Sequence, residues 1–200
     1  MKIDLQGGSK SRYYSQLNNS LDPYSACQVT AMVMGLDIAG FGLSPIETLY
    51  CDFTQPEDKL RWFMLTDGAV KSFCERSHPG GNLPPPEWAD VMCYAVNLLY
   101  GKLITYFHEP LTMDVIEKDL RDGLPLYTSM RYPRNVNFSG KPSPVSGHIV
   151  LITGIDGESV YVNDPYKNHL TGEKDGFNNR YRFDEFSAHN KGYAIRYRRV

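Results

Sequence analysis

The sequence predicts an α+β fold in which a helical first half packs on an antiparallel sheet formed by the second half. Apolar residues recur at helical spacing in several segments between residues 25 and 122. Short apolar runs separated by turn signals follow between residues 124 and 197, which is typical of strands. The chain has 200 residues, of which 42% are hydrophobic, so we expect one domain over residues 1–200.

The first predicted helix begins beside Cys27. Ser25 followed three residues later by Gln28 fits a capping box, so we expect Ser25 to be the N-cap and Cys27 the second helical residue. The apolar residues that define this helix are Val29, Met32, Val33 and Leu36. Unpaired backbone N–H groups and the positive end of the helix dipole favour a thiolate there, which would activate the Cys27 sulfur. The alternative is that Cys27 is one of four reduced, buried cysteines without chemical importance.

Three further helices are predicted. A second capping box, from Thr54 to Glu57, opens one of them, and Thr112–Asp122 is the last, with Gly123 as its stop. The apolar residues that indicate these helices are Leu60, Phe63 and Met64; Trp88, Val91, Met92, Ala95, Leu98 and Leu99; and Met113, Ile116 and Leu120.

Five segments are predicted to be strands or to begin them. They are Leu103–Phe107, Leu124–Tyr127, Ile149–Ile152, Ser159–Asn163 and Tyr193–Tyr197. The run Ile149–Ile152 is apolar without alternation, which indicates a strand buried on both faces. Asp156-Gly157 is a turn signal between the third and the fourth of these strands, so we expect a hairpin.

This hairpin would bring His148 and Asp164 together. His148 lies eight residues before Asp156 and Asp164 lies eight after it, so a hairpin centred there sets the two side by side. Asp164 could then accept a hydrogen bond from one imidazole nitrogen and leave the other to take a thiol proton. A register slip of one residue would point the side chains to opposite faces, leaving His148 a core histidine and Asp164-Pro165 an ordinary turn.

Several short motifs stand together between about residues 12 and 166. They are Tyr14-Ser15-Gln16; Ser25-Ala26-Cys27-Gln28 with Ala31-Met32-Val33; Gly147-His148-Ile149-Val150; and Tyr161-Val162-Asn163-Asp164-Pro165-Tyr166. Through these motifs the chain resembles the papain-like cysteine peptidases, specifically the stand-alone relatives of the bacteriocin-processing, double-glycine leader peptidases. The resemblance implies a papain-like fold, whose helical half carries the cysteine and whose sheet carries the histidine and the aspartate.

The resemblance also implies a role for each matching residue. Gln16 would help to form the oxyanion hole, Cys27 would attack the substrate, His148 would be the base and Asp164 would orient it. The chain departs from the family pattern after the cysteine, where glycine and proline are usual but Gln28-Val29 stand here. The shape of the pocket beside the sulfur therefore remains open at the level of sequence.

Two irregular segments could border the substrate. His78–Pro86 is rich in proline and glycine and is interpreted either as a wall of the cleft or as a stiff connector between helices. The stretch of residues 134–146 runs directly into the Gly147-His148 motif, which makes Ser143, Ser146 and Gly147 candidate substrate contacts.

Composition excludes several classes of function. The net charge of −2 gives no general case for nucleic-acid binding, and no apolar run approaches the ~20 residues needed to span a bilayer. The other histidines have no ligand spacing to one another or to the cysteines, so we expect no metal and no cofactor. Residues 1–8 contain no apolar segment, so we expect no secretory signal and a cytoplasmic location. The four cysteines have no Cys-x-x-Cys spacing, so we expect them to be reduced. We also expect a monomer.

The substrate remains the most open question. The resemblance implies peptide bonds as the substrate. Leader peptidases of that family are usually attached to a transporter, whereas this sequence has no apolar run that could span a membrane. A phage-type endolysin that reaches the cell wall through a holin and cleaves peptidoglycan stem peptides or cross-links is therefore expected first. A leader-peptide or protein-processing peptidase is the second possibility. An NlpC-type amidase, a transglutaminase-like acyltransferase and a non-enzymatic binding module stay open, although NlpC-type enzymes usually have a second histidine where Asp164 stands.

Overall fold

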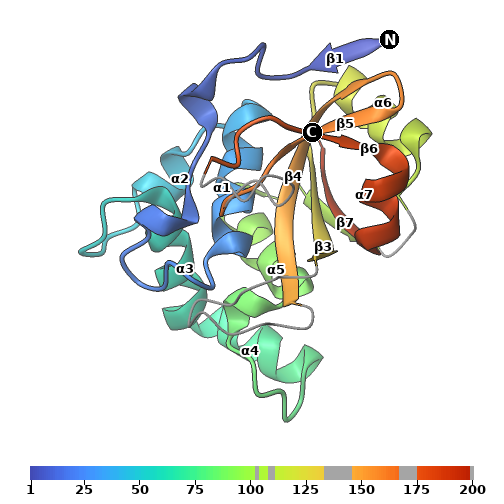
Figure 1. Cartoon of the computed structure of the whole chain (residues 1–200). Helices are drawn as coiled ribbons and strands as arrows, with labels where there is room; N and C mark the ends of the chain where they lie inside the picture. Colours follow the sequence, from blue (N-terminus) through green and yellow to red (C-terminus); the bar gives the residue numbers. More distant parts are fainter. Residues whose placement is uncertain (102–103, 108–110, 133–145, 167–174, 199–200) are drawn as a thin grey trace.

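The computed structural model describes residues 1–101, 104–107, 111–132, 146–166 and 175–198 (Figure 1). Within these residues, seven antiparallel strands form one sheet in the order β2-β7-β3-β4-β5-β6, and β1 pairs with the far end of β4. The strands are β1 (Lys2–Asp4), β2 (Ile104–Phe107), β3 (Leu126–Tyr132), β4 (Ser146–Asp156), β5 (Ser159–Asn163), β6 (Asn179–Arg182) and β7 (Asn190–Tyr197).

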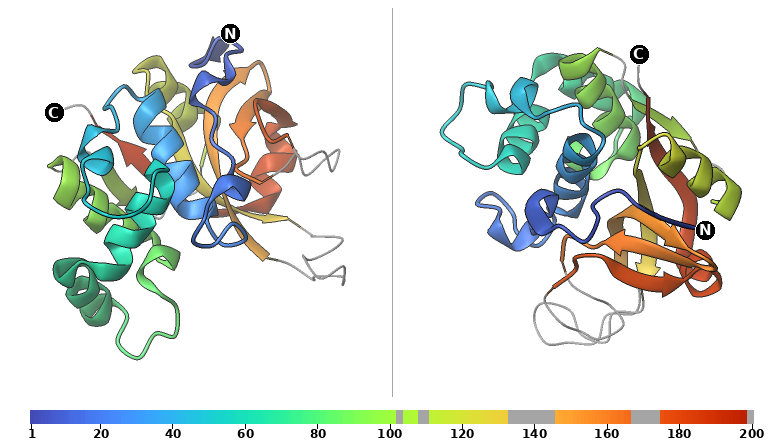
Figure 2. Two further views of the ribbon diagram at one scale, coloured as in Figure 1. Left: turned by 90° about the vertical axis from the view of Figure 1, so that its left-hand side faces the viewer. Right: turned by 90° about the horizontal axis from the view of Figure 1, so that it is seen from above.

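Helices cover both faces of this sheet. The α-helices are α1 (Cys27–Ile38), α2 (Ser44–Glu47), α3 (Pro56–Thr66), α4 (Gly68–Ser77), α5 (Ala89–Tyr100), α6 (Met113–Arg121) and α7 (Phe183–His189). Short 3₁₀ helices span Lys10–Arg12 (η1), Gln16–Asn18 (η2) and Pro85–Glu87 (η3). The helices of the first half lie together on one side of the sheet, as Figure 2 shows. The predicted α+β class is confirmed.

Two hydrophobic cores flank the sheet, and β4 contributes to both. Ile149 and Leu151 pack with α1, α3 and α5 in one core, whereas Val150 and Ile152 pack with α6 and α7 in the other. The apolar run without alternation is therefore a strand buried on both faces, as the sequence predicted.

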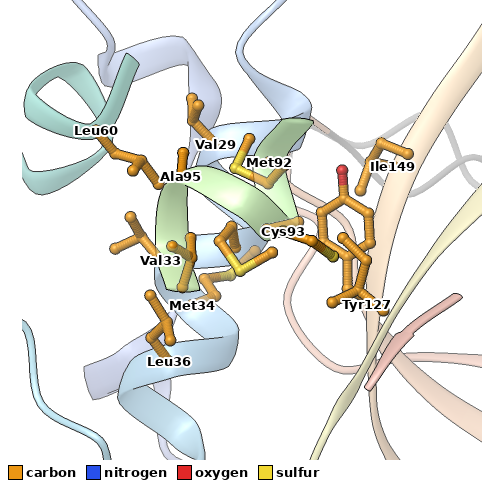
Figure 3. Packing of buried hydrophobic residues seen from close by; sticks show 14 of the residues in the cluster. Val29, Val33, Met34, Leu36, Leu60, Met92, Cys93, Ala95, Tyr127 and Ile149 are labelled. Carbon is orange, nitrogen blue, oxygen red and sulfur yellow. The ribbon is translucent and has the colours of Figure 1, made fainter. Parts of the chain in front are cut away.

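Helix α1 is buried along nearly its whole length. Its side chains pack on α3 and α5 on one side and on Tyr127 and Ile149 of the sheet on the other (Figure 3). Within α1, only Cys27 and Asp37 escape full burial. A helix that is apolar on every side needs partners on every side, and the sheet and the two helices supply them.

Both predicted capping boxes are wrong. Helix α1 starts at Cys27 rather than Ala26, and its N-cap, Ala26, makes no side-chain cap. The backbone N–H of Ser25 instead donates to the Asp22 carboxylate at 3.2 Å, and the Gln28 side chain is used in tertiary hydrogen bonds. Tertiary partners thus outcompete the local cap.

Helix α3 likewise begins at Pro56, after an N-cap at Gln55, and not at a cap from Thr54. Glu57 is 1% exposed, and desolvation raises the pKa of its carboxyl group. The start predicted for the last helix is confirmed, because α6 begins directly after Thr112, whose Oγ1 accepts a hydrogen bond from the N–H of Val115 at 3.3 Å.

The close approach of α1 to β7 leads to a prediction about stability. A Cβ atom at Gly35 would overlap the hydroxyl group of Tyr197, which is 2% exposed. We expect Gly35→Ala to lower the free energy of unfolding by about 1–3 kcal/mol, because a packed core has no room to relax. Urea unfolding would measure this. Gly68→Ala is the matched control, since nothing lies within 4 Å of a Cβ there, and an equal loss in both variants would contradict the packing explanation.

Candidate active site

The β4–β5 hairpin decides how His148 and Asp164 face each other. At its turn, Asp156 pairs with Ser159. If this register continued along the hairpin, Asp164 would lie opposite Leu151 and point to the face away from His148. The turn by itself would therefore separate the two side chains.

A β-bulge corrects this register. Between Ile152 and Gly154 the pairing shifts by one residue, and Leu151 then pairs with Asn163. Continued by one step beyond β5, this register would set Asp164 opposite Val150, on the same face as His148 and diagonal to it, at a separation that side chains can bridge. The predicted hairpin is thus present, with a register two residues from the predicted one.

His148 and Asp164 form a buried hydrogen bond. His148 Nε2 lies 2.7 Å from Asp164 Oδ1, and the same oxygen accepts the N–H of Tyr166 at 2.8 Å. The two side chains are 1% and 0% exposed. Burial alone would lower the pKa of His148, but the charge and hydrogen bond of Asp164, with smaller contributions from Cys27, raise it from 6.5 to about 9.

Cys27 is the third member of this group. It is the first residue of α1 and half-buried, and it lies close enough to His148 to contribute to the raised pKa of that imidazole. Because Nε2 of His148 bonds to Asp164, Nδ1 is the nitrogen that remains for the Cys27 sulfur. The structure therefore brings together a thiol, an imidazole and a carboxylate in the order that the sequence predicted.

Gln16 links the segments that carry Cys27 and Asp164. It opens η2 and is 1% exposed; its N–H donates to the carbonyl of Pro165 at 2.8 Å, and its Nε2 donates to the carbonyl of Pro23 at 2.9 Å. Pro165 follows Asp164 directly, and Pro23 precedes Cys27 by four residues. The bond to Pro23 fixes which end of the amide faces this loop, and Nε2 retains a second hydrogen for another acceptor.

Sequence reasoning missed Tyr13 and Gly176, which hold the backbone of Asp164. The Tyr13 hydroxyl donates to the Asp164 carbonyl at 2.8 Å and accepts the N–H of Gly176 at 3.2 Å. The N–H of Asp164 donates to the Gly176 carbonyl at 2.8 Å, and a Cβ at Gly176 would overlap the carbonyl oxygen of Asp164. Burial raises the pKa of Tyr13 above its ordinary value, so the hydroxyl keeps its proton.

A polar network supports the start of α1. The Tyr127 hydroxyl donates to Gln28 Oε1 at 3.0 Å, and Gln28 Nε2 lies 3.5 Å from Glu87. Arg61 connects Glu87, at 3.7 Å, with Asp22, at 3.0 Å. Gln28 thus joins the sheet to η3 and, through Glu87 and Arg61, to the loop before Cys27.

The predicted substrate contacts have mixed outcomes. Ser143 lies outside the described residues, Ser146 is the first residue of β4, and Gly147 is exposed and pairs with Arg131. The loop of residues 78–86 is interpreted from the sequence as a wall of the cleft or as a stiff connector, and its contacts fit both interpretations.

The first residue of this loop, His78, contacts residues that follow the loop. His78 stacks on Trp88 with ring centroids 3.7 Å apart and bonds to Asp90 at 2.9 Å. The loop runs into η3, whose Glu87 reaches Gln28, the neighbour of Cys27. In the part of the chain that the structure describes, no three His, Cys, Asp or Glu side chains gather to hold a metal ion, and every helix is too short or too polar to cross a bilayer.

The raised pKa of His148 makes its titration a test of the buried pair. A pKa of about 9 in the fold, against about 6.5 in the unfolded chain, means that protonated His148 stabilises the fold fully below pH 6.5. This stabilisation is lost as the pH rises through 9. We expect Asp164→Asn to lower the midpoint of the His148 NMR titration by at least about one unit. Asp156→Asn, on the same hairpin, should leave it unchanged, and an unchanged midpoint in Asp164→Asn would contradict the assigned cause.

Comparison with known proteins places the chain. Among the solved structures that it resembles is one described as a C39-like peptidase from Bacillus anthracis, with a TM-score of 0.59 and 16% sequence identity over 100% of this chain and 98% of that chain. At this identity the likeness concerns the fold. No curated protein matches the chain at a significant level. The family model described as "Peptidase_C39 like family" matches residues 10–189, nearly the whole chain, and the chain therefore belongs to the Peptidase_C39-like family.

Proposed function

We propose that the chain is a cysteine endopeptidase in which Cys27 is the nucleophile, His148 the general acid and base, and Asp164 the carboxylate that orients the imidazole. The observation that carries this proposal is the environment of His148, which is buried between the Asp164 carboxylate and the Cys27 sulfur. A thiol, a base beside it and a group that orients the base are the parts that thiol catalysis requires.

Protonated His148 is the resting partner of the thiolate in this proposal. With a pKa of about 9 it carries its proton at neutral pH, and this positive charge beside Cys27 favours the ionised sulfur. The position of Cys27 at the start of α1 adds the positive end of the helix dipole. Both effects favour attack without a separate base.

The reaction proceeds through an acyl enzyme. The Cys27 sulfur bonds to the carbonyl carbon of the substrate, and the C=O electron pair moves onto oxygen. When the C–N bond breaks, His148 gives its proton to the leaving amine. Water then attacks the thioester while His148 accepts its proton, and the sulfur departs as thiolate. The product acid is released and the starting ion pair is restored.

The developing oxyanion needs donors that are already in place. We propose the second Nε2 hydrogen of Gln16 and the backbone N–H of Cys27 for this role. The bond from Gln16 Nε2 to the Pro23 carbonyl supports the proposal, because it turns the donor end of the amide toward the loop that leads to Cys27. A preformed donor costs no reorganisation when charge develops.

Two substrate classes follow for this peptidase. The first is the stem peptides or cross-links of peptidoglycan, as in a phage-type endolysin. The second is a double-glycine leader or another protein segment, an alternative that is compatible with membership of the Peptidase_C39-like family. The fold and the catalytic residues would be the same for either substrate class, so an experiment with the substrates themselves must distinguish the two.

Gln16 provides a test of the mechanism. We expect Gln16→Ala to lower kcat by roughly 10² to 10³, as for loss of one oxyanion donor, while the rate of Cys27 alkylation by iodoacetamide stays near that of the wild type. Mass mapping identifies the alkylated cysteine. Asn18→Ala, in the same 3₁₀ turn but exposed, is the control and should retain full turnover. Full turnover in Gln16→Ala would remove the oxyanion assignment.

Sacculi and a leader peptide separate the two substrate classes. If the wall is the substrate, the enzyme should release muropeptides with new amino termini from purified sacculi. Cys27→Ala should release none, and Cys51→Ala, the other half-buried cysteine, should remain active. Cleavage of a double-glycine leader peptide without release from several wall types would establish the processing alternative. New reducing sugar ends would contradict peptidase chemistry altogether.

A further inference from the structure

The loop that leads to Cys27 presents two large apolar side chains to solvent. Leu21 is 38% exposed and Tyr24 is 57% exposed. Six large apolar side chains in the described residues are exposed to this degree, and they are Met1, Leu21, Tyr24, Tyr50, Leu83 and Leu98. Two of the six therefore fall within six residues of the proposed nucleophile.

The backbone of this loop, residues Ser20–Ser25, is held by hydrogen bonds to acidic side chains. The Asp58 carboxylate, 1% exposed, accepts the N–H groups of Ser20 at 2.9 Å and of Leu21 at 3.2 Å. Asp22 accepts the N–H of Ser25 at 3.2 Å and pairs with Arg61, which is itself 6% exposed. Buried charges thus fix the backbone while the apolar side chains of the loop point outward.

The loop is also adjacent to the proposed oxyanion donor. Pro23, the residue before Tyr24, accepts the hydrogen bond from Gln16 Nε2 at 2.9 Å. Tyr24 precedes Cys27 by three residues, a stretch that spans at most about 10 Å even when fully extended. A peptide whose carbonyl oxygen sits at Gln16 would therefore lie near the backbone of Tyr24.

We propose that Leu21 and Tyr24 form a specificity surface that takes a large apolar or aromatic side chain of the substrate, within about three residues of the scissile bond. This inference rests on the proposed peptidase function and narrows its substrate. A tyrosine on a fixed backbone offers contact area with little entropy left to lose on binding. The substrate so defined is a flexible protein segment or leader with a bulky apolar residue, rather than a wall peptide with small and charged side chains.

Peptide libraries test this surface. Each position within three residues of the cleaved bond would be varied among Phe, Leu, Ala and Glu, with the wild type, Tyr24→Ser, Leu21→Ser and Leu98→Ser compared. Leu98 is the matched control, because it is 50% exposed and belongs to α5. We expect the wild type to prefer Phe or Leu at one position. The two loop variants should raise KM for that substrate roughly tenfold, with kcat unchanged and with little effect on the Ala substrate.

The outcomes separate this inference from the function on which it depends. Cleavage by the wild type without preference for an apolar residue would overturn the specificity surface and leave the peptidase intact. An equal loss for Phe and Ala substrates in Tyr24→Ser would also overturn it, because that indicates a damaged site. Absence of cleavage of every library member, combined with equal alkylation of all four cysteines, would overturn the peptidase itself.

Discussion

The hydrogen bond between His148 and Asp164 is the interaction on which the rest of the site depends. Two ionisable side chains, 1% and 0% exposed, are kept where desolvation of each charge is costly. The cost is offset only if the pair is close and its remaining polar atoms are satisfied, and removing one partner of such a pair typically costs about 3–5 kcal/mol. The 2.7 Å contact meets the first of these conditions, and the N–H of Tyr166 adds a second hydrogen bond to the same carboxylate oxygen. The pair then keeps His148 protonated at neutral pH, where it can stabilise a thiolate.

Much of the surrounding fold serves to keep Asp164 at this position. The bulge in β4 selects the correct face, and Gly176 and the Tyr13 hydroxyl bind the Asp164 backbone on both sides. Tyr13 is within reach because β1 pairs with the end of β4 and starts the N-terminal segment along the sheet. Gly154 permits this pairing, since a Cβ there would lie 2.5 Å from the Ile3 carbonyl oxygen. Segments far apart in sequence thus meet at one carboxylate.

Helix α1 positions the sulfur from the opposite side. Its burial between the sheet and two helices leaves it little freedom to shift, since packed interiors do not deform continuously. The network from Tyr127 through Gln28 to Glu87 and Arg61 then fixes its first turn, where Cys27 lies. The same Arg61 holds the loop that displays Tyr24, so the sulfur and the proposed specificity surface share one support.

Local patterns in the sequence determined the elements of this protein, and the tertiary structure decided how they meet. Periodicity predicted α1, the strand buried on both faces and the returning strand Ser159–Asn163, because burial leaves a repeating signal in the chain itself. The candidate site residues Gln16, Cys27, His148 and Asp164 could be named from short motifs, from their spacing and from the family resemblance. The helix cap predicted at Ser25 failed, since Asp22 bonds to the Ser25 backbone and Tyr127 to the Gln28 side chain. The register of the hairpin depends on a bulge, and Tyr13 contacts Asp164 and Gly176 across more than 150 positions of sequence. Only the tertiary structure decides these features, because no local pattern in the sequence encodes them.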